Sequence, residues 1–332
     1  MNIHPYFIGS GAAAKAMQKA LYSAALLHSD WDLQTSQHLA RGTFPTSLPQ
    51  GINDKAVLFV ASPHALHAPA IQQGVLSEFS AIVSEKPAGV HREDLALLRS
   101  LQTPIPIAVC HGYRAMWGMK TLRNLIRDQE LGKIISVEGR YWQSSAAQRQ
   151  GQLPTTNWKN DSTLSGNSDV LIDLASHWTD LLFFLAGEKC ASASVWKSYV
   201  NAESAHRDTH VHVNMSFGTL GRTFGSISKT VHGMGNHLEI HLIGEKGRAT
   251  WTFDKPDIIT LGRGDSEQTL ARKKDVAVGS QQAPFHGQGW LEGYVEIIEK
   301  TLLHLAGQAT AEYPTLSQAL DVMEALLTAE TN

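Results

Sequence analysis

The sequence predicts two domains, an α/β domain built on a parallel sheet and an α+β domain with a mainly antiparallel open sheet. The chain has 332 residues, more than one ordinary hydrophobic core accommodates. Its first third alternates short apolar runs with helical patterns, as βαβ units do. Later strand-like stretches are joined by glycine turns, which is typical of an antiparallel meander. We place the boundary after residue 117, giving domains at 1–117 and 118–332.

The first domain begins with the apolar run 3–8, which ends at Gly9. A helix at 12–27 and a short strand at 32–36 are expected next. Only about twenty residues then precede the apolar strand 56–61, so one helix and one strand of a full dinucleotide-binding sheet are missing. The pattern continues with strands at 81–84 and 105–110 and helices at 64–74 and 92–101.

The second domain combines helices with several consecutive strands. Residues 143–168 are rich in Gly, Ser and Asn and predict a long loop, and residues 262–274 predict a solvated loop with several basic side chains. Helices are expected at 119–131, 170–185, 289–305 and 315–328, and strands at 133–142, 191–200, 209–217, 222–231, 237–243 and 248–253.

Composition excludes several classes of protein. With 42% apolar and 18% charged residues the chain is globular, and a net charge of −3 indicates no nucleic-acid partner. No apolar run is long enough for a membrane span, and the N-terminus does not have the pattern of a signal peptide. Two cysteines, Cys110 and Cys190, favour a reducing compartment, so we expect a cytoplasmic protein.

A glycine motif follows the first predicted strand. Gly9-Ser10-Gly11-Ala12-Ala13-Ala14 fits the pattern G-x-G-x-x-A at a strand-to-helix junction. Glycines allow a tight turn and a close approach of the main chain to a pyrophosphate, and the helix N-terminus presents N–H groups. The alternative is an ordinary glycine-containing βα turn. The position at the first βα junction favours a Rossmann site for NAD or NADP.

The second predicted strand lacks the acidic residue that usually binds the adenosine ribose. Ser36 stands near its end, with His38 and Arg41 close by in the sequence. A hydroxyl and cations tolerate a 2′-phosphate better than a carboxylate does. This favours NADP over NAD.

Three further segments appear in an order that is specific as a set. The first two are Ala61-Ser62-Pro63-His64-Ala65-Leu66-His67 and Ser84-Glu85-Lys86-Pro87. The third runs from Trp158-Lys159 through Ser165-Gly166 to Asp173 and His177. Together with the glycine motif, they resemble the Gfo/Idh/MocA family of oxidoreductases, which includes inositol and glucose–fructose dehydrogenases.

The resemblance implies a cofactor site and several roles. The residues it implies for the cofactor, beyond Gly9, Ser10, Gly11, Ala12, Ala13 and Ser36, are Ala61, Ser62, Pro63, His64, His67, Glu85, Lys86 and Arg114. In this family the bond between the lysine and the proline of E-K-P is often cis. The family's glycine between Asp and His is here Ala175, which is expected to reshape the substrate pocket.

These residues suit hydride chemistry. Oxidation of an alcohol needs a base for the hydroxyl proton, and an imidazole such as His177 titrates near neutral pH. Asp173 lies four residues earlier and would share its helix face, either orienting the imidazole or binding a substrate hydroxyl. The resemblance implies that Lys86 either donates to the reacting oxygen or positions the nicotinamide and the substrate. Asp180 is either a supporting residue or a structural carboxylate.

Other candidates surround this set. Tyr113, Trp158 and Lys159 are expected to line the substrate site, with a hinge and a packed loop as the alternatives. His210 and His212 share a strand face but have no third ligand at a telling spacing, so no metal is predicted.

The function that follows is hydride transfer between NAD(P) and a hydroxyl or carbonyl carbon of a small sugar, cyclitol or related polyol. Two alternatives remain: cleavage of a glycosidic bond through transient oxidation, and a non-catalytic sensor of NAD(P) or sugar. By analogy with the family, a homodimer or homotetramer is expected.

Overall fold

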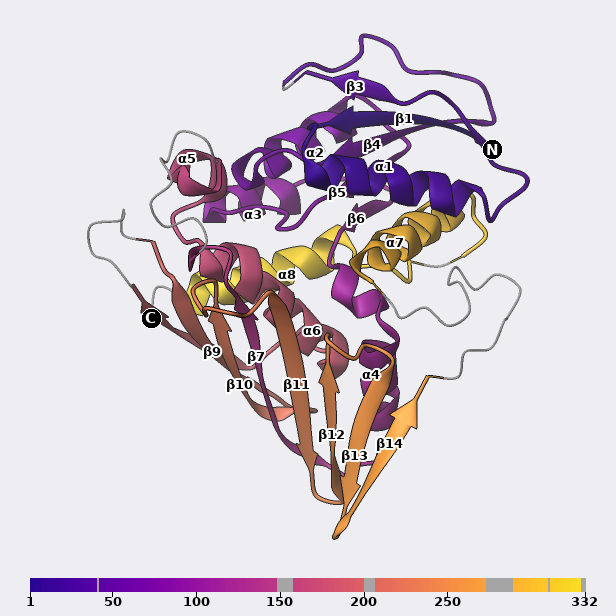
Figure 1. Ribbon diagram of the computed structural model, residues 1–332. Helices are drawn as coiled ribbons and strands as arrows, with labels where there is room; N and C mark the ends of the chain where they lie inside the picture. Colours follow the sequence, from indigo (N-terminus) through magenta and orange to yellow (C-terminus); the bar gives the residue numbers. More distant parts are fainter. Residues whose placement is uncertain (41, 148–157, 200–206, 273–288, 310, 330–332) are drawn as a thin grey trace. The chain divides into compact units, whose positions relative to one another are not determined.

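The computed structural model describes residues 1–40, 42–147, 158–199, 207–272, 289–309 and 311–329 (Figure 1). Part of the predicted polar loop, 148–157, lies outside the described residues. Within the described ranges, no helix combines the length and the apolar character that crossing a membrane requires.

The described residues group into two compact units. Unit 1 takes its residues from Met1–Gly112, Thr163–Gly166 and Trp290–Met323, and unit 2 from Tyr113–Ser162, Asn167–Gly289 and Glu324–Asn332. A single boundary after residue 117 does not describe this division, because the chain returns to unit 1 near its C-terminal end.

Unit 1 is built on a parallel sheet of six strands in the order β2-β1-β4-β5-β6, with β3 also paired to β1. All of its strand pairs are parallel, as the alternation of apolar runs and helices predicts. The first part of the predicted fold class, a Rossmann-type α/β unit, is therefore confirmed. The strands are β1 (Asn2–Ile8), β2 (Asp32–Leu33), β3 (Gln37–Leu39), β4 (Asp54–Val60), β5 (Ala81–Ser84) and β6 (Ile107–Val109).

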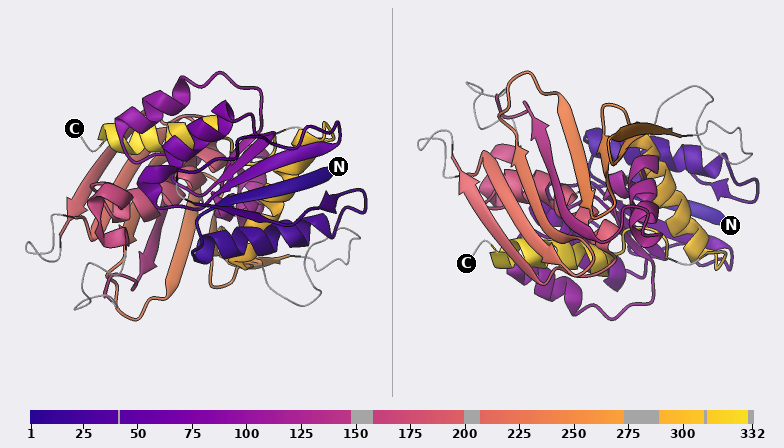
Figure 2. Two further views of the ribbon diagram at one scale, coloured as in Figure 1. Left: turned by 90° about the horizontal axis from the view of Figure 1, so that it is seen from above. Right: turned by 90° about the horizontal axis from the view of Figure 1, so that it is seen from below.

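Helices cover both faces of this sheet (Figure 2, left). Met17 and Leu21 of α1 join Phe7 and Phe59 of the strands in one buried cluster, and Ile298 of α7 belongs to the same cluster. This packing explains why α7 belongs to unit 1: its apolar side buries against α1. The helices of unit 1 are α1 (Ala12–Ala25), η1 (His64–Leu66), α2 (His67–Leu76), α3 (Arg92–Arg99), η2 (Gly112–Ala115, which ends in unit 2), α5 (Ser162–Ser165), α7 (Trp290–Leu305) and the first part of α8 (Leu316–Ala329).

Unit 2 contains an eight-stranded sheet in the order β14-β13-β12-β11-β7-β10-β9-β8. All its pairs are antiparallel except β7 with β10, so the predicted mainly antiparallel sheet is confirmed. The strands are β7 (Ile134–Gln143), β8 (Ser192–Ser198), β9 (His210–Phe217), β10 (Gly221–Ser228), β11 (Asn236–Gly244), β12 (Gly247–Thr252), β13 (Ile258–Arg263) and β14 (Ser266–Ala271).

One prediction for this sheet was wrong. Residues 262–274 were expected to form a loop, but β13 and β14 form a hairpin that turns at Gly264, whose φ is 55°. The residues of β14 are almost all exposed and polar, so no apolar alternation marks the strand. Pairing with β13 at the sheet edge is what orders it.

Helices pack on the inner face of this sheet, where Trp178 is fully buried. A Cβ at Gly139 would lie 2.8 Å from the indole, and one at Gly225 would lie 2.3 Å from it. These two glycines are register partners on β7 and β10, and their lack of side chains makes room for the ring. The helices of unit 2 are α4 (Trp117–Arg127), η5 (Trp158–Asn160), the π-helical turn η6 (Leu171–Ala175) and α6 (Ser176–Ala186).

Candidate active-site residues in the two units

The predicted phosphate-binding turn lies at the carboxyl end of β1. Gly9 has a φ of 110°, and a Cβ there would lie 2.3 Å from the carbonyl oxygen of Ala61, so only glycine fits. Gly11 precedes α1 as its N-cap, and a Cβ at Gly11 would meet nothing within 4 Å. Ser10, Ala12 and Ala13 complete the turn. The first turn of α1 has no side-chain cap and no acidic residue, so its N–H groups suit an anionic pyrophosphate.

The segment after β4 lies against this turn. Ala61 contacts Gly9, and Ser62 and Pro63 lead into η1, which begins at His64. The hydroxyl oxygen of Ser62 is buried and has no hydrogen-bond partner in the part of the chain that the structure describes. A buried hydroxyl beside an uncapped helix N-terminus is consistent with a dinucleotide at this edge of the sheet, so these residues fit the cofactor.

Ser36 does not lie where it was expected. The second strand is split into β2 and β3, and Ile8, the last residue of β1, pairs with Leu39. The carboxyl end of the strand therefore lies at Leu39, three residues beyond Ser36. The sequence predicts one strand at 32–36, whereas the structure has two short strands separated by residues 34–36. The predicted strand therefore ends too early. The ribose position of such a fold would then follow Leu39, and Arg41 there lies outside the described residues.

His67 has a supporting role beside its predicted one. Its ring is fully buried, with Nδ1 2.7 Å from the carbonyl oxygen of Pro87 and Nε2 2.8 Å from that of Ser62. Both nitrogens face main-chain carbonyl groups, and the single N–H of a neutral imidazole can donate to one of them. His67 joins the Ser62 segment to the Lys86-Pro87 segment, and its contact with a cofactor stays a prediction.

The E-K-P segment contains the expected cis bond between Lys86 and Pro87. Glu85 is buried, and its carboxylate accepts hydrogen bonds from the Lys86 N–H and from the hydroxyl of Tyr294 on α7. Tyr294 was missed by the sequence analysis. The two residues are 209 positions apart, so no local pattern could connect them.

In unit 2, Arg114 and Asp180 form a buried ion pair. The Arg114 Nε donates to Asp180 Oδ2 at 2.7 Å, and Nη2 to Oδ1 at 2.5 Å. The guanidinium also lies 5.7 Å from the centre of the Phe184 ring. This bidentate pair ties the turn at 112–115 to α6. The pair is consistent with the structural alternative for Asp180, and the predicted contact of Arg114 with a cofactor stays a prediction.

That ion pair holds Tyr113 beside His177. The two rings meet edge-to-face with centres 5.1 Å apart, and the Tyr141 ring lies 6.0 Å from the imidazole. Burial is the main cause that raises the pKa of both phenols, Tyr113 and Tyr141. At neutral pH both hydroxyls are therefore protonated donors.

The Tyr113 and Tyr141 hydroxyls have two protons to donate, but among the described residues only one of these protons has an acceptor. Asn236 Nδ2 donates to the Tyr113 hydroxyl at 3.0 Å, and Gln143 Nε2 donates to the Tyr141 hydroxyl at 3.1 Å. The two hydroxyl oxygens are 2.9 Å apart, so one hydroxyl donates its proton to the other. Among the described residues the second phenolic proton has no acceptor, so one hydroxyl can donate to a bound molecule.

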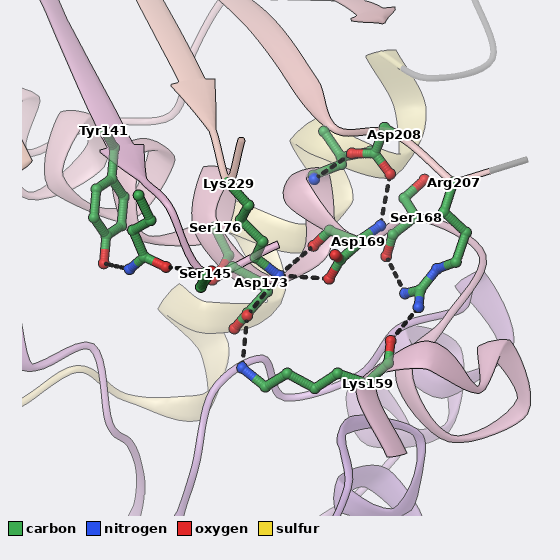
Figure 3. A network of polar contacts seen from close by, with 12 residues as sticks. Tyr141, Ser145, Lys159, Ser168, Asp169, Asp173, Ser176, Arg207, Asp208 and Lys229 are labelled. Carbon is green, nitrogen blue, oxygen red and sulfur yellow. Dashed lines mark hydrogen bonds and ion pairs between the residues drawn. The ribbon is translucent and has the colours of Figure 1, made fainter. Parts of the chain in front are cut away.

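Asp173 lies in the π-helical turn, directly before the helix that carries His177. Single π turns occur often at functional sites. Asp173 is buried, and its Oδ2 is 2.8 Å from Lys159 Nζ and 2.8 Å from Lys229 Nζ (Figure 3). Lys159 follows Trp158 in η5, with its ammonium 5.7 Å from the centre of the indole ring. Lys229 was not singled out from the sequence.

The histidine-rich strands provide no metal centre. Among the described residues no group of three or more His, Cys, Asp or Glu side chains is placed to hold a metal ion. The rings of His210 and His212 lie with their centres 4.7 Å apart and their planes tilted by 46°, on the same face of β9.

Comparison with known proteins identifies the relationship. Residues 119–250 match the model of the Gfo/Idh/MocA C-terminal domain, which is the domain that carries Asp173 and His177. This segment of the chain is therefore similar to the C-terminal domain of the Gfo/Idh/MocA family. Across 187 residues the chain is 26% identical to glucose-6-phosphate 3-dehydrogenase of Bacillus subtilis, covering 54% of this chain and 52% of that protein.

Other relatives extend the match. Levoglucosan dehydrogenase of Pseudarthrobacter phenanthrenivorans is 24% identical over 227 residues, or 61% of this chain and 57% of that protein. The matched segments thus span little more than half the length of these two curated relatives.

Solved structures share the fold over the whole chain. A levoglucosan dehydrogenase in complex with NADH has a TM-score of 0.85 at 17% identity, covering 100% of this chain and 97% of that one. An inositol dehydrogenase homologue from Azotobacter vinelandii in complex with NAD+ has a TM-score of 0.84 at 18% identity, covering 100% and 96%. At these identities the likeness establishes the fold.

Proposed function

We propose that this protein is an NAD(P)-dependent oxidoreductase of the Gfo/Idh/MocA family that acts on a CH–OH carbon of a small sugar, cyclitol or related polyol. The observation that carries the proposal is the arrangement in unit 2. The His177 imidazole packs against two phenols, and the helical segment that carries it also bears the ion-paired Asp173. The relatives named above are dehydrogenases of a sugar phosphate and of an anhydrosugar, which supports this substrate class.

His177 is the proposed acid/base group. In the direction of oxidation it accepts the proton of the substrate hydroxyl as the C–H bond breaks and the carbonyl forms. A nicotinamide bound at the glycine turn would take the hydride from that carbon. We assign Lys86 to polarising the reacting oxygen, and Asp173, Trp158 and Lys159 to contacts with the polyol.

Tyr113 is the proposed donor to a second substrate hydroxyl. Its hydroxyl accepts from Asn236 and lies 2.9 Å from Tyr141, and the spare proton of this pair needs an acceptor. A polyol offers such acceptors on neighbouring carbons, which supports a substrate with several hydroxyl groups over a simple alcohol.

Three finer assignments belong to the same proposal. We keep NADP as the favoured cofactor because no acidic residue was found near the end of the second strand. We keep a homodimer or homotetramer as the assembly, with the open face of the unit 2 sheet, where Trp196 and Phe224 are exposed, as its contact surface. The cytoplasm is the proposed compartment, since Cys110 and Cys190 are both free thiols.

The first test is calorimetric titration with NAD, NADH, NADP and NADPH, followed by a polyol screen that monitors nicotinamide absorbance. We expect one oxidised and reduced pair to bind and at least one sugar or cyclitol to yield reduced cofactor. Tightly retained cofactor without net reduction would favour the glycoside-cleaving alternative. If no dinucleotide binds at millimolar concentration and none is released on denaturation, the proposal fails and the sensor alternative leads.

A further inference from the structure

Lys229 is a buried lysine directly after β10, and the function proposed above gives it no role. Its side chain is 1% exposed, which is rare for this residue type. Its Nζ lies 2.5 Å from Asp169 Oδ1 and 2.8 Å from Asp173 Oδ2 (Figure 3). The two carboxylates, one helical turn apart in sequence, therefore share one ammonium group.

The charge state of Lys229 follows from this geometry. Burial by itself disfavours an ammonium, but the charges of Asp173 and Asp169 outweigh it and raise the pKa of Lys229. Lys229 is therefore a fixed cation beneath Asp173. A buried carboxylate without such a partner would take up a proton at higher pH.

The two lysines on Asp173 differ in their access to solvent. The Lys159 side chain is 35% exposed, whereas the Lys229 side chain is 1% exposed. Lys159 lies in the short η5 turn, and the Arg207 side chain donates a hydrogen bond to its carbonyl oxygen. An exposed ammonium can exchange its partner for a ligand, but a buried one cannot without leaving a charge uncompensated.

The helical segment that carries Asp173 is also anchored at its start. Asp208 is buried and accepts the main-chain N–H groups of Asp169 at 2.6 Å and Leu171 at 2.7 Å. Lys229 binds Asp169 in the same turn. The position of Asp173 is thus set by a main-chain anchor and a buried cation together.

We propose that Lys229 is a positioning residue for the reaction, holding the Asp173 carboxylate ionised and directed so that Lys159 and substrate can contact it. The inference rests on the proposed function. The titratable groups facing Asp173 include Lys159, Lys229, Tyr113 and Tyr141, and both phenols are neutral near pH 7. Removal of Lys229 would take away the buried cation of Asp173 and leave the more exposed Lys159 in place.

The test compares Lys229→Met with the double variant Lys229→Met/Asp169→Asn. The single variant leaves two carboxylates without their shared cation and is expected to lower thermal stability. The double variant removes the uncompensated charge at Asp169 and should recover part of that stability. Asp173 would still lack its buried partner, so we expect kcat to stay at least tenfold low, with the acid limb of the pH–rate profile at higher pH.

Lys197→Met is the matched control, because that lysine binds the Ser168 hydroxyl and comes from β8 of the same sheet. Its acid limb is expected to remain at the wild-type pH. If the double variant regains both stability and the wild-type acid limb, Lys229 has only a structural role and the inference is overturned.

A measurement without substrate separates this inference from the proposed function. The carboxyl carbon of Asp173, labelled with carbon-13 and assigned through Asp173→Asn, is titrated by NMR in wild type and double variant. A midpoint that moves to higher pH in the variant supports the role of Lys229 even if no polyol is turned over. An unchanged midpoint overturns it even if the enzyme is active.

Discussion

The glycine turn of unit 1 and the charged cluster of unit 2 differ in the groups from which they are built. The turn at 9–13 consists of main chain and small residues. It requires a residue without a side chain at Gly9, where the main chain of Ala61 approaches closely, and open space beside Gly11. The cluster around Asp173 consists of charged side chains, and its requirement is that each buried charge has a partner. Main-chain N–H groups can receive an anion without a countercharge of their own, whereas buried carboxylates cannot stand alone.

This difference teaches where each region is sensitive to change. A methyl group is enough to damage the turn, because a side chain there occupies space that the main chain or a ligand needs. The cluster tolerates changes of shape better than changes of charge.

The largest effect is expected for His177→Ala. Loss of the proposed acid/base group should lower kcat by about 10²- to 10⁴-fold. Dinucleotide affinity, measured by calorimetry, should stay within about twofold, because the glycine turn belongs to the other unit. Unchanged turnover would remove His177 from the chemistry, and lost dinucleotide binding would show that the two regions are not independent.

Arg114→Met should be the most damaging change for stability in unit 2. It leaves the buried Asp180 carboxylate, 1% exposed, without its bidentate partner, at a cost of about 3–5 kcal/mol. Replacing both partners, as in Arg114→Met/Asp180→Leu, should recover most of that loss in urea unfolding. If the double variant is no more stable than Arg114→Met, the uncompensated charge of Asp180 is not the cause of the stability loss.

Gly9→Ala and Gly11→Ala form a matched pair in unit 1. At Gly9 a Cβ would lie 2.3 Å from the Ala61 carbonyl oxygen at a φ of 110°, so we expect a loss of about 2 kcal/mol or more. At Gly11 a Cβ meets open space, so stability should change by less than about 1 kcal/mol. Dinucleotide affinity should nevertheless fall in Gly11→Ala, since the methyl group would fill open space at the helix N-terminus where we propose that the pyrophosphate binds. Equal stability losses at both positions would contradict this account.

Tyr113→Phe and Tyr141→Phe test the spare phenolic proton. Tyr113→Phe should raise the KM for the polyol about tenfold, the value of one hydrogen bond, with a smaller change in kcat. Tyr141→Phe leaves the Tyr113 hydroxyl in place and should have the smaller effect. If steady-state kinetics show neither change, the two phenols serve packing alone.

The smallest effect concerns alkaline pH. Burial raises the pKa of Tyr313 in unit 1 to about 12, against 10.0 for an ordinary phenol. The unfolded chain therefore loses this proton first as pH rises. The associated stability is complete below pH 10 and is lost between pH 10 and about 12. Tyr313→Phe should flatten that part of the stability curve, measured by thermal unfolding, and an unchanged slope would contradict the assignment.

Much of the fold could be predicted because its signals are local. The βαβ alternation, the glycine turn and the apolar strands of unit 1 are readable within short windows of sequence. Errors arose where local signals fail. The polar edge strand β14 has no apolar alternation, and the split second strand moved its end from Ser36 to Leu39.

The site shows the same division more sharply. Sequence alone selected Gly9, Gly11, Lys86, Asp173 and His177, since motif spacing carries them. It determined the family resemblance, the fold class and the residue types that suit hydride chemistry.

Only the tertiary structure decided which polar side chains form hydrogen bonds and ion pairs with one another. It joined Arg114 and Asp180 in a buried ion pair, placed His67 between two carbonyl groups, and brought Lys229 to Asp173 across 56 positions of chain. The physical reason is that a buried polar group takes its role from the partners that desolvation forces upon it. Those partners come from distant segments, so no spacing in the sequence reveals them.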